Sequence, residues 1–356
     1  MPQRTSSSRE ASRQVVPPQV VRRLLAAEAN EPGWRAPGWP GAGDLDDRPA
    51  ATGTHAQVHR ARWTDGRDVA VKIQHPGALA RAGNQRSRMS RMSGMLRLMS
   101  PGFPVDALIE EIHEAALAEL DYRQEAANQR AFAAAYRDDP DLFVPEVLYA
   151  GERLMVAEWA AGVPLTEVTH AGTRAECDRI GGVLTALQLS APSRTGLVHA
   201  DPDPDNLRLL DDGRLAVLDF GAVAELPAGL PADLGRLLRA AADGDGGQVT
   251  SILQRLQVVA PAHRVDPRTL LRLAEETVLP TLRPGFRFDQ GWLKRRVVAV
   301  MFGRHNVSTI RHLRLPPGYI QLVRAVVSTV DTLCALEAGV DVRAAMARWL
   351  PGFAAP

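Results

Sequence analysis

The stretch "GLVHADPDPDNLRLLDDGRLAVLDFGA" (residues 196–222) places three aspartates within five residues. Carboxylates spaced so closely repel one another, so they imply a cation or another compensating positive charge. A calcium loop is one template, because acids stand at its positions 1, 3 and 5. It is rejected because Asn206 replaces the glycine required at position 6, and the short Asp212 replaces the glutamate at position 12.

The same stretch matches a phosphoryl-transfer catalytic loop, H-x-D-x-x-x-x-N, followed by D-F-G after an apolar strand. His199, Asp201 and Asn206 keep the spacing of the loop, and Asp219 begins the D-F-G. We predict that Asp201 orients or deprotonates an attacking hydroxyl. Asn206 and Asp219 would supply the hard oxygen ligands that Mg²⁺ prefers. His199 is interpreted as a structural histidine that binds the loop backbone.

Such a site also needs a cation for the phosphates of a nucleotide, and the chain holds only two lysines among 42 basic residues. One of them, Lys72, lies in "RDVAVKIQ" (67–74), which alternates as a strand does. Ala70 shares its face and leaves room for an adenine ring beside the lysine. The pattern therefore predicts that Lys72 binds the phosphates, whereas Lys294 is interpreted as surface charge.

The lysine in turn needs a carboxylate to hold it. The helix predicted over 106–136 offers Glu119, Asp121 and Glu125. At about 100° per residue, Asp121 and Glu125 share a helix face, while Glu119 points well away from it. The residues alone leave the choice among these acids open.

The chain divides into three parts by pattern. Residues 1–50 predict a flexible extension with one helix over 17–29. Residues 51–160 predict a small β-rich part with strands in 55–63, 67–74, 142–150 and 153–160 and the one main helix. Residues 161–350 predict a large helical part, with segments over 230–242, 247–259, 267–279, 289–302 and 318–338. The fold class is therefore α+β.

Composition excludes several kinds of protein. A formal net charge of +1 provides no overall field to attract nucleic acid. The two cysteines lie far apart without paired histidines, which favours neither a disulfide framework nor a zinc site. Since no apolar run approaches the roughly 18 residues of a spanning helix, we expect a cytoplasmic protein. The basic, methionine-bearing segment 78–99 predicts a helix; packing on the body is favoured over contact with a membrane surface.

Four segments carry a resemblance to a known family: "AQVHRARWTDGRDVAVKIQHPG", "ELDYRQEAAN", the aspartate stretch, and "LPPGYIQLVRAVVSTVDTL". They resemble the UbiB/AarF/ADCK family of atypical, protein-kinase-like proteins over roughly residues 50–340. The resemblance implies a two-lobed kinase-like fold, binding of ATP and Mg²⁺, and kinase or ATPase activity tied to isoprenoid-quinone or lipid metabolism. It also implies a lipid, a quinone precursor or a biosynthetic complex as partner, and a peripheral place at the inner face of a membrane.

Residue roles follow from that resemblance. Lys72 is similar to the nucleotide lysine and Glu125 to its helix partner. Glu119 and Asp121 look like the family's E-x-D pair. Glu158 to Ala160 resemble the hinge whose backbone meets adenine, and 78–99 resembles the insertion before the E-x-D helix.

The chain departs from the family pattern at three places. The family's A-A-A-S phosphate loop reads Ala51-Thr52-Gly53-Thr54 here, and we expect Gly53 and Thr54 to let the backbone approach phosphate closely. The usual D-P-H-P-G-N loop carries Asp203 and Asp205 in place of His and Gly. The K-x-G-Q element is not found in residues 1–50, which hold no lysine, so we expect a more open site.

Two other functions stay open at this point. A small-molecule phosphotransferase of the aminoglycoside or choline kinase type also uses an H-x-D-x-x-x-x-N loop. A pseudoenzyme that serves as a nucleotide-gated scaffold would retain the same ligand residues. Turnover that depends on Asp201 would separate both catalytic readings from the scaffold.

Overall fold

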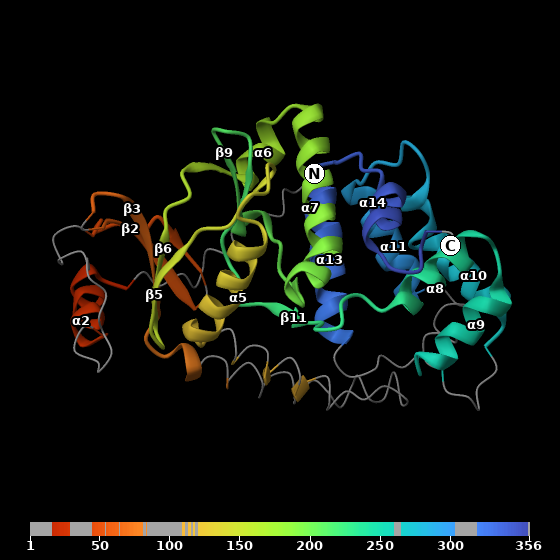
Figure 1. Ribbon diagram of the computed structural model, residues 1–356, viewed down its shortest axis with the longest axis horizontal. Helices are drawn as coiled ribbons and strands as arrows, with labels where there is room; N and C mark the ends of the chain where they lie inside the picture. The colour runs from red at the N-terminus through yellow and green to blue at the C-terminus, as the bar shows by residue number, and fades with distance from the viewer. Residues whose placement is uncertain are drawn as a thin grey trace.

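The structure is a computed structural model, and it describes residues 16–28, 45–53, 55–63, 65–80, 83, 109–110, 113–114, 117, 120–259, 265–302 and 319–354. Thr54, Glu119 and most of the segment 78–99 lie outside the described residues. Figure 1 shows the β-rich lobe at one end and the helical lobe at the other, with α5 and α7 between them. This is the α+β, two-lobed arrangement that the sequence predicts.

The β-rich lobe is built on a five-stranded antiparallel sheet in the order β1-β2-β3-β6-β5. Its strands are β1 (Ala51–Thr52), β2 (Ala56–Arg62), β3 (Asp68–Gln74), β5 (Val147–Ala150) and β6 (Leu154–Glu158). Val69, Val71 and Ile73 are buried on one face of β3 as the alternation predicts. Lys72 therefore faces the other side of the sheet.

The predicted N-terminal helix is α2 (Pro18–Glu28), and it packs on the sheet. Its Val21 and Leu25 share a hydrophobic cluster with Val69 and Val71 of β3. This segment therefore contributes to the core of the β-rich lobe. The boundary drawn at residue 50 stays a prediction.

The main helix of this lobe, α5 (Tyr122–Ala135), is shorter than the predicted 106–136. The described residues at 109–110, 113–114 and 117 are helical, but Leu120 lies in a turn. Asp121 has extended backbone angles and caps α5 by accepting a hydrogen bond from the Arg123 amide at 2.9 Å. The prediction that Asp121 and Glu125 share a helix face is wrong, because Asp121 stands before the helix.

The helical lobe holds the other long helices. They are α6 (Leu165–Ala171), α7 (Arg174–Thr195), α8 (Ala232–Ala242), α9 (Gly246–Arg255), α10 (Pro267–Glu276), α11 (Gln290–Phe302), α13 (Tyr319–Ala335) and α14 (Val342–Trp349), with the 3₁₀ turn η2 (Leu279–Leu282). The segments predicted after residue 230 match α8 to α13, whereas α6, α7 and α14 were not predicted individually.

The core of this lobe forms around α7, which lies beside α13 and α14. Gly181 of α7 permits a close approach, since a Cβ there would stand 2.6 Å from the Ala338 Cβ. Both cysteines are free and buried in this core. Among the described helices, none is long and apolar enough to cross a membrane.

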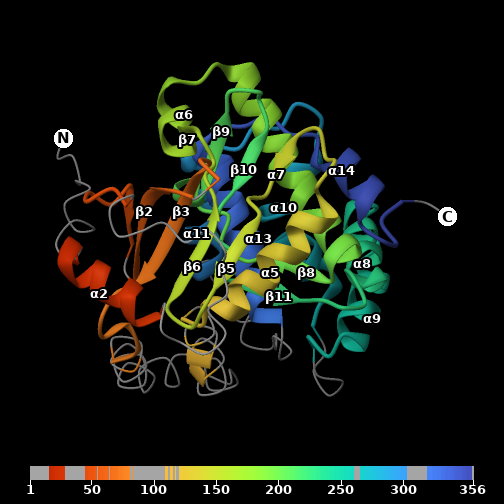
Figure 2. The same cartoon turned by 60° about the vertical axis from the view of Figure 1, so that its left-hand side comes forward.

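The aspartate stretch forms short strands on the side of the helical lobe that faces the sheet (Figure 2). β8 (Leu197–His199) pairs with β11 (Val223–Glu225). Between them, the 3₁₀ turn η1 (Pro204–Asn206) leads into the hairpin of β9 (Leu207–Leu210) and β10 (Leu215–Val217). β4 (Leu142–Phe143) and β7 (Gly162–Pro164) flank that hairpin in a four-stranded sheet. This framework brings Asp201, which follows β8, close to Asp219, which precedes β11.

Candidate active site

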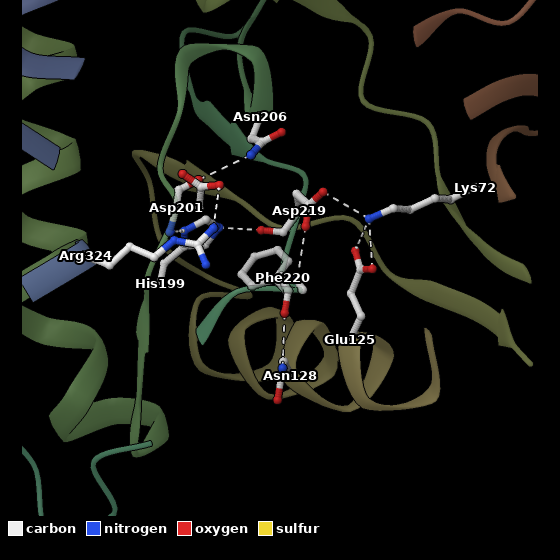
Figure 3. A network of polar contacts seen from close by, with 10 residues as sticks. Lys72, Glu125, Asn128, His199, Asp201, Asn206, Asp219, Phe220 and Arg324 are labelled. Carbon is white, nitrogen blue, oxygen red and sulfur yellow. Dashed lines mark hydrogen bonds and ion pairs between the residues drawn. The ribbon is translucent and has the colours of Figure 1, made fainter. Parts of the chain in front are cut away.

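Lys72 binds one carboxylate from each lobe, Glu125 of the β-rich lobe and Asp219 of the helical lobe (Figure 3). Its Nζ lies 2.7 and 2.8 Å from the two carboxylate oxygens of Glu125 on α5, and 3.0 Å from Oδ2 of Asp219. The Glu125 side chain is fully buried and the Lys72 side chain is 15% exposed. The ring of Tyr122 lies beneath the ammonium, 5.2 Å from Nζ to the ring centroid. Of the three acids considered from sequence, Glu125 is therefore the one that α5 brings to the lysine.

The charges of this cluster depend on one another. Burial alone would lower the pKa of Lys72, but the carboxylates of Asp219 and Glu125 outweigh it and raise that pKa above its ordinary value. Burial raises the pKa of Glu125 to about 7, although the Lys72 ammonium opposes the change. Burial would also raise the pKa of Asp219, yet Lys72 and the Gly221 amide hold it below its ordinary value. Lys72 therefore stays charged at neutral pH and can attract an anionic phosphate.

His199 fastens the catalytic loop to the D-F-G segment. Its Nε2–H donates to the Asp219 carbonyl oxygen, and its Nδ1 accepts from the Asp201 amide at 3.3 Å. The ring is fully buried, and burial lowers the pKa of His199, so the neutral form fits both contacts. As interpreted from the sequence, this histidine binds backbone and positions the loop.

Phe220 fixes the D-F-G segment from the other side. Its ring is fully buried, with its centroid 4.9 Å from that of Phe132 and 5.2 Å from that of His199. Asn128 of α5 donates from Nδ2 to the Phe220 carbonyl oxygen at 3.1 Å. Because Phe132, Asn128 and Glu125 all belong to α5, that helix positions the lysine and the D-F-G segment together.

The carboxylate of Asp201 is held by α13, whose Arg324 follows it by 123 residues. Arg324 places Nη2 3.1 Å from Oδ2, and Ser328 places Oγ 3.2 Å from Oδ1. One turn further, Thr332 donates to the Pro202 carbonyl oxygen at 2.7 Å. Sequence reasoning missed these residues. Their only signal is the four-residue spacing of polar positions in the mostly apolar "LVRAVVSTVDT".

Asn206 and Asp219 present oxygens that suit a divalent cation. Asn206 donates from Nδ2 to the Asp201 carbonyl oxygen at 3.2 Å, which leaves its Oδ1 without a donor among the described residues. Asp219 accepts from the Gly221 amide at Oδ1 and from Lys72 at Oδ2. Amide and carboxylate oxygens are hard ligands, so this pair fits Mg²⁺, whose remaining ligands are commonly water and phosphate oxygens.

A pocket lies between the lobes beside this cluster. Its apolar part is lined by Val58, Ala70, Met155, Ala157 and Leu218, and its polar part by Lys72, Asp205, Asn206, Arg208 and Asp219. Glu158, Trp159 and Ala160 line the far end from Lys72, because β6 pairs Glu158 with Val69 but Met155 with Lys72. The pocket thus joins an apolar part to a charged part.

At that far end, one backbone N–H group of the three lining residues donates to no described residue. The Glu158 amide donates to the Glu146 carbonyl oxygen and the Trp159 amide to that of Asp68. The amide of Ala160, a residue only 6% exposed, has no acceptor among the described residues. Since buried N–H groups are nearly always paired in proteins, this amide indicates a place for a ligand.

Three further residues that the sequence singles out form turns and caps of the backbone. Gly53 sits in the turn between β1 and β2, where its amide donates to Ala56 at 2.8 Å and a Cβ would meet only ordinary contact. Asp121 is exposed and caps α5, and no contact joins it to Lys72 among the described residues. Asp203 caps η1 by accepting from the Asp205 amide at 2.9 Å.

Comparison with known proteins places this geometry in a family. Residues 43–253 match the ABC1 atypical kinase-like domain. An Arabidopsis chloroplastic protein named ACTIVITY OF BC1 COMPLEX KINASE 1 is 30% identical over 232 residues, which are 63% of this chain and 34% of that protein. A Drosophila AarF domain-containing kinase 1 is 32% identical over 196 residues, 51% of this chain and 36% of that protein. The chain thus matches about a third of the length of these relatives.

A solved structure covers nearly the whole chain. It is that of Rv3197 from Mycobacterium tuberculosis, described as a complex with erythromycin. The two chains are 36% identical with a TM-score of 0.78, over 96% of this chain and 85% of that one. Together with the site geometry, these matches show that the chain belongs to the ABC1 family of atypical kinase-like proteins, the UbiB/AarF/ADCK family that its motifs resemble.

Proposed function

We propose that the protein binds ATP with Mg²⁺ and transfers the γ-phosphoryl group, as an atypical kinase or ATPase. The observation that carries the proposal is the position of Lys72, which lies between Glu125 and Asp219 at the charged end of the pocket. The unpaired amide of Ala160 at the other end supports adenine as the group bound there.

Each part of the nucleotide has a matching part of the pocket. The adenine would lie between Ala70 and Leu218, with Ala160 as its hydrogen-bond donor. Lys72 would bind the phosphates. Asn206 and Asp219 would hold Mg²⁺, which supplies neutralisation of the phosphate charge.

Asp201 would act on the nucleophile. A hydroxyl oxygen forms the new bond to the γ-phosphorus, the bond to the ADP oxygen breaks, and the hydroxyl proton passes to the Asp201 carboxylate. Arg324 and Ser328 hold that carboxylate in place, so we assign them as positioning residues. With water as the nucleophile, the same geometry would perform ATP hydrolysis.

For the acceptor we propose a hydroxylated apolar molecule, such as an isoprenoid-quinone precursor or a lipid. Family membership supports this class. Val327 also supports it, because this residue is 60% exposed and lies on α13 three residues after Arg324. Apolar surface therefore borders the part of α13 that holds Asp201. A peripheral place at a membrane and contact through 78–99 belong to the same proposal.

Thermal unfolding with increasing Mg-ATP tests the nucleotide site. The wild type should be stabilised in proportion to ligand saturation, and Lys72→Ala and Asp219→Asn should show no shift. Asp211→Ala is a matched control, because this exposed acid lies in the turn between β9 and β10, away from the pocket lining. Absence of a shift in the wild type would refute nucleotide binding.

A small-molecule phosphotransferase is the second candidate, and the solved relative described with erythromycin favours it. A macrolide carries several hydroxyl groups on an apolar ring and therefore fits the acceptor class proposed above. Incubation with erythromycin and Mg-ATP, followed by mass spectrometry, should then show a mass increase of one phosphoryl group. Rapid transfer to erythromycin, with no effect of lipid or phenolic quinone precursors, would favour this candidate over the first.

A scaffold without turnover is the third reading. It predicts that the wild type binds Mg-ATP but releases phosphate no faster than Asp201→Asn, with or without anionic lipid or quinone-like phenols.

A further inference from the structure

Asp205 is a pocket residue that the proposed function leaves without a role. It lines the pocket together with Lys72 and Ala160, and its side chain is exposed. Its carboxylate has no hydrogen bond or ion pair with any residue that the structure describes. Arg208, three residues later, forms no ion pair with it among the described residues, and its Nη1 donates to the Gly162 carbonyl oxygen at 2.9 Å. The lining of the pocket therefore includes a carboxylate whose two oxygens accept from no described residue.

The two additional aspartates of the loop have different positions. The Asp203 side chain accepts from the Asp205 amide and caps η1, and it is absent from the pocket lining. That cap fixes the backbone from which the Asp205 side chain extends. Asp203 is thus a loop-forming residue, and Asp205 is the one placed to contact a ligand.

The fold places Asp205 between the two ends of the pocket. η1 packs against β7 and α6, which directly follow the hinge residues Glu158 to Ala160. β9 begins beside β7, with Arg208 opposite Pro164. On its other side, Asp205 adjoins Asn206, one of the two proposed Mg²⁺ ligands. Asp205 therefore lies between the proposed adenine end of the pocket, at residues 158–160, and the proposed phosphate end, at Asn206.

The part of a nucleotide that joins the base to the phosphates is the ribose. Its 2′- and 3′-hydroxyls are two adjacent donors, and a carboxylate is an acceptor suited to them, as in the acid that binds ribose in dinucleotide folds. A phosphate would repel this carboxylate. No three acidic, histidine or cysteine side chains of the described chain gather closely enough to hold a metal ion, so Asp205 does not join Asp201 and Asp219 in such a cluster.

We propose that Asp205 binds the ribose hydroxyls and gives the site a preference for ribonucleotides over deoxyribonucleotides. This inference rests on the proposed ATP site and identifies the residue that binds the ribose of the nucleotide.

Calorimetric titration with the Mg²⁺ complexes of ATP, 2′-deoxy-ATP and 3′-deoxy-ATP tests the inference. We expect the wild type to bind each deoxy analogue roughly tenfold more weakly than ATP, as for the loss of one hydrogen bond to a charged group. Asp205→Ala should bind all three within about twofold of one another. Asp211→Ala, which removes the same charge from the neighbouring turn, should keep the wild-type preference.

The outcomes separate the inference from the function on which it rests. If the wild type binds none of the three nucleotides, the proposed function fails and the inference with it. If the wild type binds all three equally, or if Asp205→Ala keeps the tenfold preference, only the ribose assignment is overturned. A preference kept by Asp205→Ala together with a higher Mg²⁺ requirement would assign Asp205 to the metal instead.

Should Asp205→Ala fail to fold, Asp205→Asn keeps the shape and one acceptor oxygen. It should then show an intermediate preference, and a full wild-type preference would contradict the proposal.

Discussion

Replacing Lys72 by methionine removes a cation from a buried carboxylate while keeping most of the side-chain volume. Glu125 is fully buried and loses the ammonium at 2.7 Å, and the loss of one partner of a buried pair costs about 3–5 kcal/mol. Asp219 also loses Lys72, but its side chain is 37% exposed and solvent screens it, so it adds little. We therefore expect Lys72→Met to lower the free energy of unfolding by about 3–5 kcal/mol where Glu125 is charged.

This cost should depend on pH in a defined direction. A carboxyl group whose pKa is raised by folding stabilises the folded state at low pH and loses that contribution as pH rises through the folded pKa. In the wild type the loss runs from the ordinary value of 4.5 to about 7. Without Lys72 the folded pKa is higher still, so the loss continues above pH 7. The difference between wild type and variant should then grow by up to about 1.4 kcal/mol per pH unit.

Urea unfolding of the wild type, Lys72→Met and Lys72→Met/Glu125→Gln at pH 6 and pH 8.5 measures these differences. The double variant should recover most of the lost stability at pH 8.5, because no buried charge remains, while still failing to bind Mg-ATP. A cost of the single variant below about 1 kcal/mol at pH 8.5, or an equal cost at both pH values, would show that Lys72 does not compensate a buried charge on Glu125.

Three further predictions concern residues around the cluster. Arg324→Ala should lower the turnover number for phosphate release about tenfold or more with little change in Kd for ATP, since Asp201 loses a partner; an unchanged turnover number would remove its positioning role. Phe220→Ala should cost about 3–5 kcal/mol in urea unfolding, because the ring is fully buried, and a cost under 1 kcal/mol would contradict its packing. Asp121→Ala should cost about 1 kcal/mol through loss of the α5 cap, with Asp121→Asn retaining most of the stability.

Local patterns predicted the parts of the site whose chemistry lies in one segment. The alternation of β3 placed Lys72 on the face opposite Val69 and Val71, because side-chain direction in a strand repeats every two residues. The sequence spacing predicted that Asp201 and Asp219 belong to one site, because both residues lie in the continuous segment from β8 to β11. These predictions depend on local sequence alone and on no contact between distant segments.

The predictions that were wrong or missing depend on where helices end and on which helices and strands contact one another. The apolar stripe before residue 120 suggested one long helix, but the cap formed by Asp121 starts a separate helix. Arg324 and Ser328 reach Asp201 only because α13 packs beside α7 and β8, and nothing local marks that contact. The division between a capping Asp203 and a pocket-facing Asp205 likewise becomes visible only with η1 in place.

Steady-state phosphate release from Mg-ATP, measured for the wild type and Asp201→Asn, tests whether the site around Asp201 catalyses phosphoryl transfer. We predict measurable turnover by the wild type and a loss of about 100-fold or more in the variant, with nucleotide affinity retained, because the role proposed for Asp201 is to act on the nucleophile and this residue lies outside the pocket lining. Equal rates of phosphate release from the two proteins would contradict catalysis at this site.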